Sequence, residues 1–361
     1  MGRENNVAAE SRDAGVLSTR LTSFEICAGA GGLALGLERA GFDPVLLIDN
    51  RDVSCETLRL NRPAWDVREV DLLTFDPDTA RHVYDVDLLS GGLPRVKSSA
   101  TAGRARGDDQ ELAVLRAAVD MIHAVQPRAV MLENVPDLVR KDAYDEIRAF
   151  VADELDHLGY RLHWRVMNAA HHGVPQNREV GLLVAFQDDL IDRFAWPEPL
   201  LSPPPTLGEA LRETMGSGGW NGVDAWAELA DEIAPTVVGG SWERGGADLG
   251  PTGAKRKWAR LGVDGGTIAD AVPDTDFVLD PNLGRYGLVP LTVQQVALLQ
   301  GFPPEWTIAG YKTKRYRQVA NATPPPLAHA LGAAMYDALT TVGDPGVGAR
   351  SVTPLRPSDR R

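Results

Sequence analysis

A strand, a glycine turn and a helix follow one another near the start of the chain, and this unit most constrains its fold. The stretch SFEICAGAGGLALGLERAGF begins with a short apolar run at residues 24–28, followed by Gly29, Gly31 and Gly32. Apolar residues then recur at a helical spacing, which predicts an amphipathic helix that ends at Gly41. Such a turn lets a nucleotide-like ligand approach the backbone and leaves helix N–H groups facing it. A tight turn that binds no ligand would use the same glycines.

Two acidic residues end the next two predicted strands. The run VLLID ends in Asp49, a helix is expected over residues 51–60, and the run VREVD ends in Asp71. An acid after the second strand of such a fold can accept hydrogen bonds from a ribose diol, and an acid after the third can reach an adenine amine. Either aspartate could instead cap the segment that follows it. The alternation of helices and strands predicts an α/β fold with a doubly wound, mostly parallel sheet.

A tight loop follows the next predicted strand, where VDLL runs into the residues SGGLPRVKSS. The small, polar and basic residues after it, SSATAGRARGDDQE, predict a mobile loop. A helix is expected over residues 111–124, and the buried strand RAVMLENV then ends in Glu133 and Asn134. These two side chains are expected to point into the crevice where open α/β sheets bind ligands. Burial there would raise the pKa of Glu133, which suits a general acid.

The sequence changes character at about Pro197. Clustered prolines and then clustered glycines disturb the apolar periodicity, which predicts a smaller, loop-rich second domain that carries recognition. Most of its tryptophans are expected in the core, although one could anchor an interface. These tryptophans are Trp220, Trp226, Trp242 and Trp258. An amphipathic helix in LTVQQVALLQGF and a last helix after Pro-Pro-Pro restore the order. Flexible tails are expected at residues 1–20 and 343–361.

The charge and cysteine content exclude several classes of protein. The formal net charge of −13 argues against non-specific adhesion to nucleic acid, because such binding depends on neutralising phosphates. Basic clusters at residues 255–260 and 312–317 could still form a local DNA face, or only a solvated surface. Two cysteines make no disulfide framework, and no apolar run reaches the roughly 20 residues of a membrane span. These features predict a reduced, cytoplasmic protein without a membrane segment.

The order of these motifs resembles that of the DNA (cytosine-5)-methyltransferase family over about residues 23–340. FEICAGAGG is similar to the family's cofactor motif, GGLPRVKSS to its catalytic loop, and LENV to its Glu-Asn-Val motif. QNREV, LTVQQVALLQGFP and QVANATPPPLAHALG are similar to its later motifs. The stretch TVVGGSWERGGADLGPTGAKRKWARLGVDG resembles one class of its target-recognition segments.

This resemblance implies a Rossmann-like class I methyltransferase fold. The implied catalytic domain is formed by residues 21–196 and 318–342, and the target-recognition domain with a hinge helix by residues 197–317. S-adenosylmethionine or S-adenosylhomocysteine is the implied cofactor. Double-stranded DNA is the implied partner, with a partner methyltransferase or restriction-modification subunit as a further possibility, and the location would be cytoplasmic or nucleoid-associated. The implied cofactor-binding residues are Glu25, Cys27, Gly29, Gly31, Gly32, Asp49, Asn50, Asp71, Leu72, Pro94 and Asn321.

The family's chemistry needs a thiol at the catalytic loop. A cysteine thiolate adds to carbon 6 of a flipped-out cytosine, a carboxylic acid offsets charge at the ring nitrogen, and carbon 5 then attacks the methyl group. The resemblance assigns Glu133 and Arg178 to this site and puts Arg95 where the thiol stands. A guanidinium has a pKa above about 12 and no free lone pair at neutral pH, so Arg95 cannot be the nucleophile.

Further positions of the same motifs depart from the family pattern. Val96 replaces a Gln, Val180 replaces an Arg that orients the target cytosine, and Ala320 replaces a Gly. Gln110 lies where an Arg is common. The sequence therefore predicts a divergent family member that binds S-adenosylmethionine and DNA, while methylation is lost or impaired.

Two other interpretations stay open. The chain could be an active cytosine-5 methyltransferase of the restriction-modification type through another nucleophile, although Cys27 and Cys55 fit better as small buried residues on the cofactor side. It could also be an S-adenosylmethionine-dependent enzyme of altered chemistry, in which Arg95 holds a phosphate or an oxyanion.

Overall fold

The structure, a computed structural model, describes residues 20–96, 108–240, 242 and 246–341. The predicted tails up to residue 19 and from residue 343, and the stretch 97–107 with most of the predicted mobile loop, lie outside these ranges. None of the helices within them combines the length and apolar character that crossing a bilayer requires.

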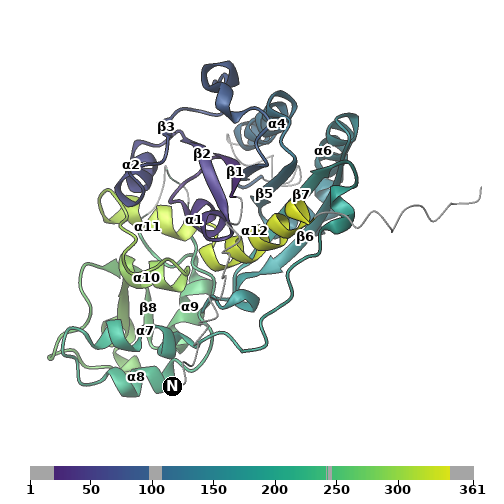
Figure 1. Ribbon diagram of the computed structural model, residues 1–361. Helices are drawn as coiled ribbons and strands as arrows, with labels where there is room; N and C mark the ends of the chain where they lie inside the picture. Colours follow the sequence, from purple (N-terminus) through teal and green to yellow (C-terminus); the bar gives the residue numbers. More distant parts are fainter. Residues whose placement is uncertain (1–19, 97–107, 241, 243–245, 342–361) are drawn as a thin grey trace, which may run out of the picture.

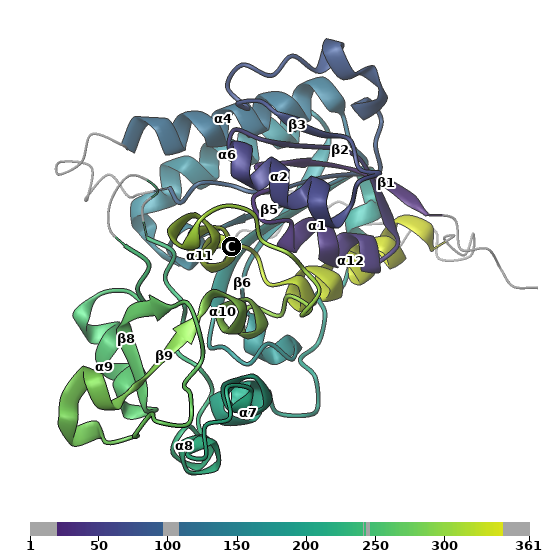
Figure 2. The same cartoon turned by 90° about the vertical axis from the view of Figure 1, so that its left-hand side faces the viewer.

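A seven-stranded sheet forms the centre of the larger part of the molecule (Figures 1 and 2). Its strand order is β3-β2-β1-β4-β5-β7-β6, and every neighbouring pair is parallel except the two pairs that involve β7. This arrangement confirms the predicted doubly wound, mostly parallel sheet. The strands are β1 (Leu21–Ile26), β2 (Phe42–Asp49), β3 (Val67–Glu69), β4 (Leu88–Gly92), β5 (Ala129–Asn134), β6 (Tyr160–Asn168) and β7 (Glu179–Gln187).

Helices cover both faces of this sheet, with α1 and α12 on one face and α4 and α6 on the other (Figure 1). On the α4 side, Ile122 and Leu155 pack with Leu89 of β4, while on the other side Leu331 and Met335 pack with β7. Each face thus has its own apolar core, as a parallel sheet requires. The helices are α1 (Gly32–Arg39), α2 (Asp52–Asn61), α4 (Asp108–Val125), α5 (Pro136–Arg140), α6 (Asp145–His157) and α12 (Pro325–Thr340).

The smaller part is more ordered than the sequence predicts. It contains a two-stranded parallel sheet of β8 (Val263–Ala269) and β9 (Val289–Thr292), and the 3-10 segment η5 (Pro281–Gly287). Its helices are α7 (Leu207–Gly216), α8 (Val223–Leu229) and α9 (Thr252–Arg260). Each helix is short, and the surrounding glycines hide its apolar spacing, although a capping box between Thr206 and Glu209 marks the start of α7.

The tryptophans of this part divide as the sequence predicts. Trp220, Trp226 and Trp258 are buried in its core, whereas Trp242 is half-exposed and lies under the guanidinium of Arg51, 4.5 Å from ring centroid to Cζ. Trp242 therefore contacts the larger part of the molecule.

One apolar core joins the smaller part to the first helix of the larger one. Leu35 of α1 belongs to the same buried cluster as Trp258, Val296 and Val319. The last two lie on the connecting helices α10 (Val293–Leu299) and α11 (Lys312–Asn321). The domain boundary predicted after residue 317 falls inside α11, and the division into two domains stays a prediction.

Candidate functional site

The parallel strands bring most of the predicted site residues to one edge of the large sheet. Cys27, Asp49 and Glu133 lie at or just after the carboxyl ends of β1, β2 and β5, and Arg95 follows β4. The strand β3 ends at Glu69, so Asp71 lies two residues beyond it rather than at its end. The edge therefore holds a group of carboxylates on one side and the Arg95 loop on the other.

Asp49 organises the glycine turn. Its Oδ2 accepts a hydrogen bond from the N–H of Gly29 at 2.9 Å, and its Oδ1 accepts one from the N–H of Arg51 at 2.9 Å. Burial raises the pKa of Asp49, and the Gly29 N–H partly offsets this effect. Asp49 thus ties the residue that precedes α2 to the turn after β1, while its role in binding a ribose stays a prediction.

The three glycines of the turn differ in their surroundings, and their cofactor role stays a prediction. A Cβ on Gly32 would lie 2.1 Å from the Thr323 carbonyl oxygen, and one on Gly31 would lie 2.5 Å from Cδ2 of Leu58. A Cβ on Gly29 would meet only a carbonyl oxygen at 4.0 Å, although its φ of +55° still favours glycine. Gly31 and Gly32 are therefore required by packing, and Gly29 alone leaves open space for a ligand.

Two further predicted cofactor residues pair with each other. Asn50 donates a hydrogen bond from Nδ2 to Oδ2 of Asp71 at 3.1 Å. The other oxygen of Asp71 accepts the N–H of Leu73 at 3.0 Å, while Leu72 is buried. The exposed Asn50–Asp71 pair marks the outer end of the site.

Glu25 is the most deeply buried acid of this group, with 1% of its surface exposed. Its Oε1 has no hydrogen-bond partner among the described residues. Burial raises its pKa well above the usual range, while the backbone N–H of Ala34 partly offsets this effect and the charge of Asp49 adds to it. A carboxyl with an unpartnered buried oxygen, beside a second carboxylate, fits a ligand that carries positive charge.

Replacing Glu25 with glutamine should stabilise the protein at neutral pH and leave its stability unchanged in acid. Because the folded pKa lies above the unfolded value of about 4.3, the folded state binds more protons and stability falls as pH rises through the folded pKa. We expect the free energy of unfolding of the variant to exceed that of the wild type by roughly 1–2 kcal/mol at pH 7.5. Urea unfolding at pH 4.0 and 7.5 measures it, and an equal difference at both pH values would contradict the charge explanation.

The Arg95 loop is held on both sides of that residue. Nδ2 of Asn134 donates to the Pro94 carbonyl at 3.0 Å, and Oδ1 of Asn134 accepts the N–H of Val96 at 3.2 Å. The Tyr144 hydroxyl donates to the Val96 carbonyl at 3.2 Å. The sequence predicts that Asn134 points into the crevice, whereas the structure shows that it fixes the loop. Pro94 and Arg95 are exposed between these anchors.

Glu133 carries the carboxyl that the sequence assigns to acid chemistry. Its Oε2 accepts a hydrogen bond from the Thr323 hydroxyl at 3.2 Å. Burial raises its pKa, as predicted, and the positive charges of Arg178 and then Arg95 act in the opposite direction. The site therefore contains one carboxyl that faces two guanidinium groups.

Arg178 is buried and joins three parts of the chain. Its Nη1 donates to the carbonyls of Val237 at 3.2 Å and Ala320 at 3.1 Å, while Nε has no partner among the described residues. Burial lowers its pKa to about 10, and Glu133 partly offsets this effect. Arg178 thus connects the start of β7 with the smaller part and with α11.

A second buried polar residue supports the same junction, and the sequence prediction missed its role. Gln176 is completely buried, donates from Nε2 to Oε1 of Gln300 at 2.8 Å, and accepts the N–H of Val237 at 2.8 Å. Asn321 lies close by, since a Cβ on Gly239 would be 2.2 Å from its Oδ1. In the sequence, the signal for this role is Gln176 two residues before Arg178 in QNREV.

The two cysteines are poor nucleophiles in their places. Burial, followed by the charge of Asp49, raises the pKa of Cys27 to about 12 and that of Cys55 to about 11. Cys55 is buried and Cys27 half-buried, in agreement with the prediction that both are small packing residues. Neither thiol therefore ionises appreciably at neutral pH.

Comparison with known proteins agrees with this geometry. A family model described as C-5 cytosine-specific DNA methylase matches residues 21–337. The chain belongs to this family. It is 43% identical to the Type II methyltransferase M.NaeI of Lentzea aerocolonigenes, over 90% of this chain and 76% of that protein. It is 38% identical to the Type II methyltransferase M.NgoMIV of Neisseria gonorrhoeae, over 89% of this chain and 98% of that protein.

Solved structures share the fold of this methylase-family chain. The methyltransferase EhMeth of Entamoeba histolytica has a TM-score of 0.61 at 12% identity, covering 89% of this chain and 99% of that chain. The Dnmt2 methyltransferase of S. pombe has a TM-score of 0.57 at 16% identity, covering 89% and 100%. The fold is that of a class I S-adenosylmethionine-dependent methyltransferase, and S-adenosylmethionine is its cofactor. Glu25, Asp49 and the open face of Gly29 suit this positively charged nucleoside.

Proposed function

We propose that the chain binds S-adenosylmethionine and double-stranded DNA, while methyl transfer to carbon 5 of cytosine is lost or severely impaired. The observation that carries this proposal is Arg95, which stands in the loop after β4 where the family resemblance expects the thiol. The chain's two cysteines are poor substitutes for that thiol, because burial raises both of their pKa values. A bound cofactor would supply a methyl group, but no described side chain would activate the cytosine.

The charge that Arg95 brings to the site points in the same direction. A general acid at the ring nitrogen must be protonated when it donates. Burial raises the pKa of Glu133, which favours the protonated acid, while the positive charges of Arg178 and then Arg95 act in the opposite direction. In place of a nucleophile, Arg95 therefore adds a positive charge that partly offsets the effect of burial and so opposes protonation of Glu133.

The proposed role is binding, either to DNA alone or together with a partner methyltransferase or restriction-modification subunit. The alternative is an active Type II-like DNA methyltransferase, and the 43% identity to a relative of that name favours it. Incorporation of tritiated methyl groups into duplex DNA separates the two: the proposal expects none, and the alternative expects transfer.

The cofactor half of the proposal is tested by replacing Asp49 with alanine. The change removes the acceptor that holds the Gly29 N–H and a charge at the cofactor edge. We expect affinity for S-adenosylmethionine to fall about 10- to 100-fold in titration calorimetry, because hydrogen bonds to charged groups contribute about 1.5–3 kcal/mol. Glu56, exposed on the neighbouring α2, gives the matched control Glu56→Ala. Equal affinities for the two variants would contradict the assigned role of Asp49.

A further inference from the structure

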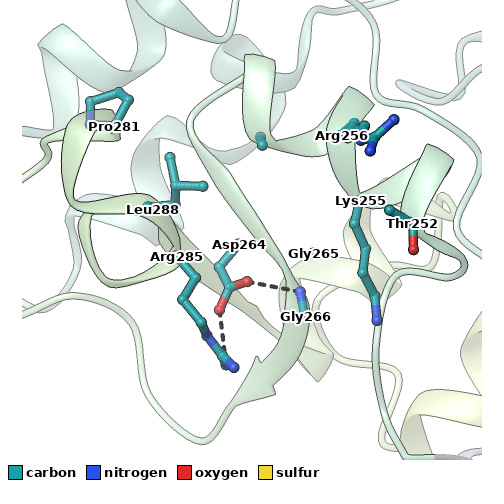
Figure 3. Close-up of a pocket in the computed structure, with 11 residues that line it drawn as sticks. Thr252, Lys255, Arg256, Asp264, Gly265, Gly266, Pro281, Arg285 and Leu288 are labelled. Carbon is teal, nitrogen blue, oxygen red and sulfur yellow. Dashed lines mark hydrogen bonds and ion pairs between the residues drawn. The ribbon is translucent and has the colours of Figure 1, made fainter.

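The smaller part contains a cavity with a positively charged lining. Its volume is about 370 Å³, and it opens between α9, β8 and η5 (Figure 3). Lys255 and Arg256 line one side and Arg285 the other, with Asp264 and Gly266 between them. Three cations and one carboxylate thus line a cavity in a chain whose net charge is −13.

Asp264 forms an ion pair with Arg285. The carboxylate of Asp264 is nearly buried, and its Oδ1 accepts the N–H of Gly266 at 2.8 Å. Its Oδ2 accepts a hydrogen bond from Nη2 of Arg285 at 3.3 Å, while 57% of the Arg285 side chain is exposed. A buried acid that is anchored to the backbone therefore orients a guanidinium whose outer donors face solvent.

Exposed apolar side chains lie beside Arg285. Tyr286 is 84% exposed and Leu283 is 58% exposed, both within η5. Large exposed apolar groups next to an oriented cation are typical of surfaces that meet another molecule. On the opposite side of the cavity Arg256 is exposed, and it has no ion-pair partner within the described part of the chain.

The cavity is connected to the candidate site through few contacts. Lys255 pairs with the carboxylate of Asp248 at 3.1 Å. The Tyr316 hydroxyl is hydrogen-bonded to the carbonyls of Asp248 and Val238, and the preceding carbonyl, that of Val237, accepts from Arg178. A molecule that contacts both the cavity and the candidate site would therefore be bound by segments that are hydrogen-bonded to one another.

We propose that Arg285, positioned by Asp264, reads a guanine in the major groove of bound DNA. This inference rests on the DNA binding proposed above. The guanidinium presents two parallel N–H groups that match O6 and N7 of guanine, which a lysine ammonium cannot do. The ion pair with Asp264 restricts the orientations of that fork before binding, so Asp264 is a positioning residue. Arg256 and Lys255 then neutralise neighbouring phosphates.

The test selects DNA with the full-length protein in the presence of S-adenosylhomocysteine. A library of duplexes with a randomised 20-base-pair segment is retained on the wild type and on Arg285→Ala, Arg285→Lys and Asp264→Asn, and retained duplexes are sequenced. Arg212→Ala is the matched control, because Arg212 forms an exposed ion pair with Asp224 elsewhere in the smaller part. We expect a wild-type motif in which the three test variants lose about 10- to 100-fold preference at one G·C pair, whereas Arg212→Ala keeps it.

Several results would overturn the inference. A uniform loss of affinity over all sequences in Arg285→Ala would make Arg285 a phosphate contact. If Arg285→Ala keeps the wild-type DNA motif but no longer binds poly-glutamate, a probe for acidic peptides, the cavity would belong to an acidic protein partner. If the wild type retains no DNA, the proposed function fails and this inference fails with it. Thermal melting identifies any variant that does not fold. If Arg285→Ala does not fold, Arg285→Lys, which keeps the charge, shows whether the preference at the G·C pair depends on the guanidinium.

Discussion

Replacing Arg95 with cysteine should produce methyl transfer to duplex DNA where the wild type gives only background. Asn134 and Tyr144 hold the backbone on both sides of residue 95, so the new thiol would occupy the place that the family resemblance assigns to it. The charge of Arg178 nearby would favour the thiolate. Nucleophile removal in other enzymes costs many orders of magnitude, and we expect a gain of about a thousandfold or more in incorporated tritium.

The control for this experiment is Arg95→Ser, which removes the guanidinium but supplies a weak nucleophile. Transfer by the cysteine variant alone would show that the missing thiol limits the chain. Equal transfer by both variants would show that the charge of Arg95 was the only obstacle, contrary to the proposal. If only the double variant Arg95→Cys, Val180→Arg is active, orientation of the target base also limits methyl transfer. We expect this double variant to be less stable than the wild type, because Val180 is buried in β7 and an arginine there would bury a charge.

Replacing Arg178 with alanine should lower the free energy of unfolding by about 3 kcal/mol. The substitution leaves the carbonyls of Val237 and Ala320 without their donor and removes the positive charge that faces Glu133. Unpaired buried polar groups each cost about 1–3 kcal/mol. Urea unfolding followed by circular dichroism measures the change at pH 7.5.

The matched control is Arg140→Ala, which removes a neighbouring arginine whose ion pair with Glu179 is exposed. We expect little change from this control, since exposed ion pairs contribute little. A similar, small effect of both substitutions would contradict the view that Arg178 joins the two parts of the molecule.

The sequence predicts the large sheet well because its signals are local. Each buried strand runs into a glycine, an acid or an amide, and parallel strands necessarily bring those carboxyl ends to one edge. The raised pKa of Glu133 follows from its position at the end of a buried strand.

The roles that the sequence missed depend on contacts between distant segments. Gly32 is required by the carbonyl of Thr323, almost 300 residues later, which no local signal announces. Asn134 lies in the predicted place but fixes the Arg95 loop, because both of its amide atoms reach backbone groups there. The helices of the smaller part escaped prediction since each is short and lies among glycine-rich segments.

The most direct test of the central claim measures binding and transfer on the same preparation of wild-type protein. Calorimetry with S-adenosylmethionine is followed by incubation of the complex with mixed-sequence duplex DNA and tritium-labelled cofactor. The account predicts saturable cofactor binding and no tritium in cytosine above background. Incorporation of tritium into 5-methylcytosine by a chain that carries Arg95 would contradict it.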